Sequence, residues 1–185
     1  MLPDISNRIN NLSKALEGVI IPAIGEGESF AAEQAALMLG HLKMLDQQWD
    51  KAYLYEKGSF DNMVALASTL SHYAEGGQQS QLSNKTLVDL LANLPDILPL
   101  TVSAISTLIA DLGHAVDALI RAAYSDGSPE FKAALFTTVL DYNRCQSARE
   151  RTWFKSNNLD PDVRDLPDMD DMLNSSTYLY EGINQ

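Results

Sequence analysis

The chain has 185 residues, with 13 basic and 25 acidic side chains, so its formal net charge is −12. Nucleic-acid binding depends largely on basic contacts to phosphate, and anionic membranes attract basic segments, so this charge counts against both kinds of partner. The single cysteine cannot form a disulfide within the chain. The longest run without a charged residue, 97–110, spans 14 residues and is too short to cross a bilayer. We therefore expect a soluble, cytoplasmic protein with a sizeable core.

Apolar residues recur at helical spacing along almost the whole chain. This spacing predicts six helices, over residues 5–21, 29–57, 59–73, 84–94, 100–124 and 128–156. Gly58 is expected to end the second helix, and the polar, glycine-led residues 76–81 are expected to form a loop. Alternating steps of four and three residues place apolar residues on one stripe of each of the first two helices: Ile5, Ile9, Leu12, Leu16 and Val19, and then Ala31, Ala35, Met38, Leu42, Leu45, Trp49 and Ala52.

The pattern predicts an all-α fold, mainly an antiparallel helical bundle of four long and two short helices followed by an acidic segment. Residues 1–156 form the expected bundle domain. Residues 157–185 carry seven acidic side chains against one arginine, which is −6, or half of the net charge. Because the last predicted helix ends in basic residues, we expect this acidic tail to pack back on the bundle.

Two histidine-containing patterns bear on metal binding. Asp111 and His114 lie three residues apart on one helical face, and His41 and His72 lie on other predicted helices, so a metal site in a bundle core is one hypothesis. The di-iron bundles need two Glu-x-x-His pairs, and the sequence has none. A hydrogen-bonded Asp–His pair on the polar side of the helix is the alternative interpretation, and it requires no cofactor.

Aromatic residues gather near the ends of two predicted helices. If those helices are neighbours, Trp49, Tyr53, Tyr142 and Trp153 line a pocket for an apolar ligand, although core packing explains the same pattern. Cys145 lies near Arg144 in the sequence, and neighbouring cations can lower the pKa of a thiol. No partner base is identifiable, and the nucleophile and phosphate-loop motifs are missing from the sequence.

Residues 16–24 (LEGVIIPAI) and 30–37 (FAAEQAAL) resemble the opening of a group of small, uncharacterised, all-helical bacterial proteins. The resemblance covers about residues 16–55. That group is associated with genes for acyl-CoA dehydrogenases and for kinases of the aminoglycoside-phosphotransferase type. The resemblance implies a bacterial cytoplasm and an accessory role beside coenzyme A chemistry, and it implies no catalytic residue.

These observations favour a non-enzymatic accessory or binding protein that engages a protein partner or an apolar, acyl-type ligand. One alternative is a metal-dependent helical-bundle enzyme that uses Asp111 and His114. Another is a regulator that binds its partner through the acidic tail. Self-association through an exposed apolar stripe is a further option, because the same stripe serves packing within one chain and packing between chains.

Overall fold

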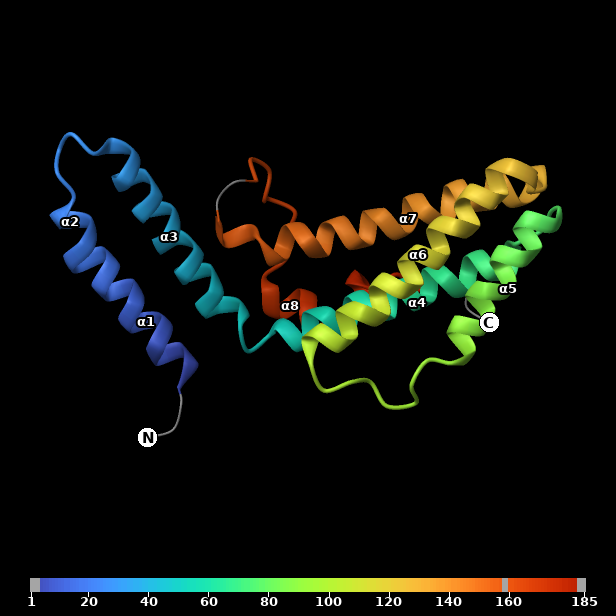
Figure 1. The fold of residues 1–185 in the computed structure, drawn as a ribbon, viewed down its shortest axis with the longest axis horizontal. Helices are drawn as coiled ribbons and strands as arrows, with labels where there is room; N and C mark the ends of the chain where they lie inside the picture. The colour runs from blue at the N-terminus through green and yellow to red at the C-terminus, as the bar shows by residue number, and fades with distance from the viewer. Residues whose placement is uncertain (1–3, 158–159, 183–185) are drawn as a thin grey trace. The chain divides into compact units, whose positions relative to one another are not determined.

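A computed structural model describes residues 4–157 and 160–182, and it confirms the all-α fold. About 78% of these residues are helical, and none of them belongs to a β-strand. The elements follow one another along the chain as labelled in Figure 1. They are α1 (Ile5–Ala15), the π-helical turn η1 (Leu16–Ile20), α2 (Ile21–Ala23), α3 (Ser29–Gln48), α4 (Ala52–Tyr73), α5 (Gln78–Ala92), α6 (Val102–Asp126), α7 (Pro129–Trp153), the 3₁₀ turn η2 (Lys155–Asn157), α8 (Met169–Asn174) and the 3₁₀ turn η3 (Ser176–Tyr178).

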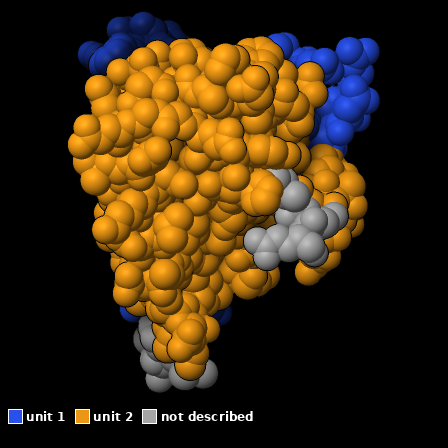
Figure 2. Space-filling model, turned by 90° about the vertical axis from the view of Figure 1, so that its right-hand side faces the viewer, with its two compact units in different colours: residues 1–52, 153–166 blue, residues 53–152, 167–185 orange. Residues whose placement is uncertain are grey.

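The chain forms two compact units, which Figure 2 colours separately. Unit 1 comprises residues 1–52 and 153–166, and unit 2 comprises residues 53–152 and 167–185. This division differs from the expected bundle of residues 1–156 with a separate tail at 157–185. The physical reason is that the apolar core cluster of the described residues is built by α4 to α7, while α1 and α3 pack on each other.

Unit 1 is a helical hairpin. Asp4 caps α1 by accepting the backbone N–H of Asn7 at 3.1 Å, and α1 and α3 then lie side by side in antiparallel directions (Figure 1). The Ser6 hydroxyl donates to the Asp46 carboxylate at 2.6 Å across this pair. The later segment of unit 1 is tied to α3 by the Gln48 amide, which donates to the backbone carbonyl of Trp153 at 2.8 Å.

Unit 2 is a four-helix bundle. Its core takes buried side chains from all four helices: Leu66, Ala67 and Leu70 of α4, Leu87 of α5, Leu112, Ala115, Val116, Leu119 and Ala123 of α6, and Phe131 and Leu135 of α7. The turn between α6 and α7 is formed as the sequence predicts. The Ser128 hydroxyl accepts the backbone N–H of Phe131 at 3.1 Å, and Pro129 opens the helix.

Gly58 does not end a helix, which corrects the predicted boundary. The break falls at residues 49–51, and α4 runs through Gly58 without interruption. A Cβ atom at position 58 would lie 2.3 Å from Nη2 of Arg149. Glycine is therefore present at this point because α7 places a buried guanidinium against the backbone of α4.

The start of α5 also differs from the sequence prediction, because residues 78–81 are helical rather than part of a loop. The cap comes from the far end of α6. The Asp126 carboxylate accepts the backbone N–H groups of Gln79 and Ser80, at 2.7 and 3.0 Å, and the Ser80 hydroxyl at 2.6 Å. A carboxylate at a helix N-terminus is favourable both as a hydrogen-bond acceptor and through the helix dipole.

We expect Asp126→Asn to lower the stability of unit 2 at pH 7. Both carboxylate oxygens of Asp126 accept hydrogen bonds, and in the variant the amide NH₂ would replace one of these acceptors with a second donor. The hydroxyl of Ser80 and the two backbone N–H groups hold the pKa of Asp126 below its usual range. The carboxylate therefore stabilises the fold fully above about pH 4, and this contribution disappears as the pH falls through the lowered pKa. Urea unfolding followed by circular dichroism should give a lower free energy of unfolding for the variant than for the wild type at pH 7, and this difference should become smaller in acid. Asp117→Asn, on the exposed side of α6, should show no such difference.

The segment after residue 166 belongs to unit 2 and contributes to its interior. Met172 of α8 is completely buried. The ring of Tyr180 packs edge-on against Tyr142 of α7, with 6.1 Å between ring centroids, and its backbone N–H donates to the Asn62 side chain of α4 at 2.8 Å. Apolar and backbone contacts thus hold this segment on α4 and α7.

Within the described residues, α6 is the one helix that is long and apolar enough to span a bilayer by length and composition. Core helices of water-soluble proteins meet the same criterion. In unit 2 the buried row of α6 supplies five of the eleven side chains of the core cluster.

Candidate functional site

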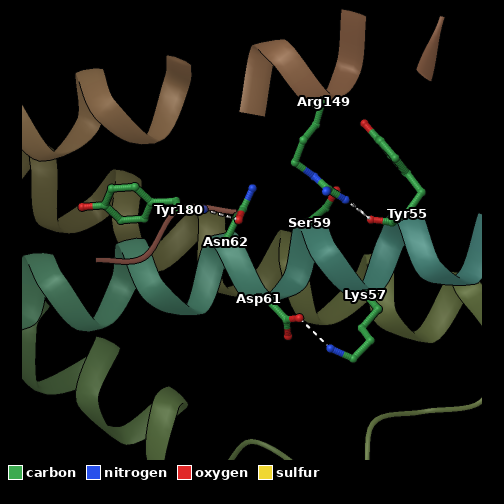
Figure 3. Close-up of polar contacts among 7 residues, drawn as sticks. All are labelled: Tyr55, Lys57, Ser59, Asp61, Asn62, Arg149 and Tyr180. Carbon is green, nitrogen blue, oxygen red and sulfur yellow. Dashed lines mark hydrogen bonds and ion pairs between the residues drawn. The ribbon is translucent and has the colours of Figure 1, made fainter. Parts of the chain in front are cut away.

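A row of polar side chains crosses the interface between α4 and α7 (Figure 3). The Asn62 amide donates to Oε1 of Gln146 at 3.1 Å, and Nε2 of Gln146 lies 3.2 Å from the Glu150 carboxylate and 3.5 Å from the Ser59 hydroxyl. Asn62 also accepts the backbone N–H of Tyr180. Because Asn62 is completely buried, each hydrogen bond that its own side chain forms offsets the desolvation of that side chain.

Arg149 is the most unusual member of this region, because its side chain is only 1% exposed. Nη2 donates to the backbone carbonyl of Tyr55 at 3.0 Å, and the guanidinium lies over the Tyr55 ring, 5.4 Å from its centroid. Nε has no hydrogen-bond partner among the described residues. Burial lowers the pKa of Arg149 and, together with the charge of Glu150, raises the pKa of Tyr55 to about 12. The arrangement fixes α7 on α4. Steps of three and four residues place Arg149 on the same stripe of α7 as Phe131 and Trp153, which is the signal that the sequence offers for its burial.

The four aromatic residues predicted to line a pocket divide between the two units. Trp49 follows α3 in unit 1, where the buried Trp153 also lies, with its carbonyl bonded to the neighbouring Gln48. Tyr53 and Tyr142 belong to unit 2, and Tyr142 packs on Tyr180. A ligand pocket lined by all four stays a prediction.

The predicted metal ligands are exposed on their helices. Asp111 and His114 lie on the outer side of α6, His72 stacks edge-on against Tyr73 near the end of α4, and His41 lies on α3 of unit 1. Within residues 4–157 and 160–182, no group of three or more histidine, cysteine or acidic side chains is placed to hold a metal ion. The metal hypothesis stays a prediction that rests on one Asp–His pair.

Cys145 is half-buried on α7, and its environment opposes thiolate formation. Burial and the nearby Asp141 carboxylate raise the pKa of this thiol. The sequence left two interpretations, a thiol activated by the arginines nearby in the chain and an idle cysteine, and the raised pKa counts against the first. Arg144 is instead engaged by Asp141 at 3.3 Å, and Arg149 is directed at Tyr55.

Eight large apolar side chains of the unit 1 hairpin are between 45% and 73% exposed. Six of them gather on one side of the hairpin, whereas Phe30 and Leu37 are turned away on α3. We call the six the hairpin face, and it consists of Ile5, Leu12, Val19, Ile20, Met38 and Leu45. Ile9, Leu16 and Ala35, which lie between these residues in the sequence, are buried. The predicted apolar stripes are therefore divided in the structure into a buried line between the helices and an exposed line next to it.

The π-helical turn η1 extends the exposed line. The backbone N–H of Ile21 bonds to the carbonyl of Leu16, five residues back, and a turn of this kind accommodates one additional residue. Val19 and Ile20 therefore both lie at the end of the line. An open hollow of about 570 Å³ elsewhere, beside α8, is lined by mainly polar side chains: Pro167, Asp171, Asn174, Ser175, Thr177 and Tyr178.

No family model, curated protein or solved structure matches the chain. The resemblance of residues 16–55 to the group of bacterial helical proteins thus stays a prediction, and any functional argument has to rest on the chain's own surface and core.

Proposed function

We propose that this chain is a helical protein-binding module that docks through the hairpin face of unit 1. The observation that carries the proposal is the exposure of six large apolar side chains on one hairpin. Together they present on the order of 500 Å² of apolar surface, which is at the upper end of what monomeric proteins expose. Covering such a surface with a partner removes it from water and is favourable.

The form of the surface favours a polypeptide over a small molecule. Small-ligand sites are concave and enclose most of their ligand, whereas the hairpin face consists of two parallel lines of side chains along α1 and α3. Lines of apolar residues at helical spacing are the feature that a partner helix recognises. This supports the protein-partner branch of the sequence hypothesis rather than the acyl-ligand branch.

Unfolding measurements on two variants test whether the hairpin face is free for a partner. Leu12→Glu should leave the free energy of unfolding of dilute protein within about 0.5 kcal/mol of wild type, because the side chain is exposed. Leu16→Ala, one turn away and only 5% exposed, should cost about 2–5 kcal/mol. Tryptophan fluorescence reports on this unit directly, because Trp49 and Trp153 both lie in unit 1 and are the chain's two tryptophans.

Two results would contradict the proposal. A loss for Leu12→Glu as large as that for Leu16→Ala would show that the chain covers the face itself. Native mass spectrometry of the wild type and of Leu12→Glu would give the second of these results. An added mass of a few hundred daltons that Leu12→Glu removes would show that the face holds a small molecule instead of a protein.

A further inference from the structure

We infer that the partner of the hairpin face is the same face of a second copy, so that two hairpins form an intermolecular four-helix bundle. This inference rests on the proposed function and specifies its partner. It is carried by the position of the two exposed lines on the hairpin, by their lack of charge, and by the area that they offer.

The two exposed lines lie on the same side of the hairpin. On each helix the exposed line is reached by stepping three residues forward from the buried line: from Ile9 to Leu12 on α1, and from Ala35 to Met38 on α3. Three residues turn a helix by about 300°, or 60° in the negative sense. Because α1 and α3 are antiparallel, a turn of the same size and sense from the buried line of each helix brings both exposed lines to the same side of the hairpin.

The lengths of the two arms also match. The helical stretch from Ile5 to Ala23 has 19 residues, and α3 has 20 residues, so each arm is about 30 Å long. Docking two such hairpins face to face places four helices of equal length around one apolar seam, the arrangement of up-down bundles.

Local charge permits a second copy at this face. The net charge of −12 opposes self-association in general, and a contact surface without charged side chains adds no local repulsion to it. The hairpin face consists only of apolar side chains. The ion pair between Glu17 and Lys43, at 3.3 Å, lies on the opposite side, because each residue directly follows a residue of the contact line and is turned from it by about 100°.

The available area is sufficient for a stable dimer. A standard interface buries about 800 Å² on each partner. The six apolar side chains provide more than half of that area. The polar side chains that border them on the two helices, Arg8, Gln34 and His41, are exposed and provide a polar rim. An apolar centre with such a rim is the usual composition of a homodimer interface.

The inference is tested by sedimentation velocity on the full chain between about 1 and 100 μM, and we expect a mass of twice 20.3 kDa at the upper end. Met38→Glu should weaken the dimer by about 100-fold or more, because it would bury an unpaired charge at the centre of each face. Leu37→Glu is the matched control. It makes the same kind of change at an equally exposed neighbour that is turned away from the face, and it should leave the dimer intact.

The outcomes separate this inference from the proposed function. A dimer that survives Met38→Glu would show that another surface mediates association, and it would overturn the inference. A monomer at all concentrations, with a stable Leu12→Glu variant, would also overturn it but would leave the face free for a different protein. A monomer in which Leu12→Glu is as destabilising as Leu16→Ala would overturn both. Circular dichroism confirms that each variant is folded.

Discussion

Replacing Gly58 with alanine should destabilise the protein by about 1–3 kcal/mol, whereas the same replacement in an Arg149→Ala background should stabilise it by up to about 1 kcal/mol. In the wild type the added Cβ would lie 2.3 Å from Nη2 and 2.8 Å from Cζ of Arg149. The guanidinium has no free space into which to move, because the side chain is buried against α4. Without the arginine, the added Cβ meets no clash, and the higher helix propensity of alanine makes the change in stability favourable.

The measurement is a double-mutant cycle, with the free energy of unfolding obtained from urea titrations followed by far-ultraviolet circular dichroism. Gly113→Ala is the control, because Gly113 also lies inside a helix but a Cβ there would have only Met63 near it, at 3.8 Å. That variant should be neutral or slightly stabilising in both backgrounds. If Gly58→Ala behaves in the same way as Gly113→Ala, the close packing of Arg149 on Gly58 is disproved.

The fold class was predictable from the sequence because helical periodicity is a local property that survives in almost every packing arrangement. The boundaries that failed depend on residues far away in the chain. A glycine at position 58 is typical of a helix end, but here its missing side chain makes room for Arg149, which lies 91 positions later in the chain. The first turn of α5 is polar and without periodicity, and it is helical because Asp126 supplies its cap from 46 to 47 positions away.

The candidate site was predictable only in part, for a related reason. The sequence places Ile5, Ile9 and Leu12 on one stripe, but a stripe alone does not show which of its members face the other helix. In the structure Ile9 turns to α3 and the other two turn to solvent. The metal and pocket hypotheses joined residues on separate helices, and proximity between helices depends on tertiary packing that periodicity does not encode.

Deleting residues 167–185 should lower the free energy of unfolding of unit 2 by about 3–5 kcal/mol or more, because the segment fills part of the interior. The deletion removes the fully buried Met172 and exposes the ring of Tyr142. It also takes away the backbone donor that bonds the buried Asn62. The tail-regulator hypothesis predicts the opposite result, namely a bundle of unchanged stability that has lost a partner.

Two point variants show which force holds this segment, even if the deletion prevents folding. Met172→Ala should cost about 2–4 kcal/mol, since it leaves a cavity in a fully buried position. Asp171→Asn, which removes one of the segment's exposed charges, should change stability by less than about 0.5 kcal/mol. Urea titration at low and high salt completes the test. If Asp171→Asn or added salt releases the segment while Met172→Ala does not, charge holds the tail on the bundle, and the apolar contacts of Met172 and Tyr180 are secondary.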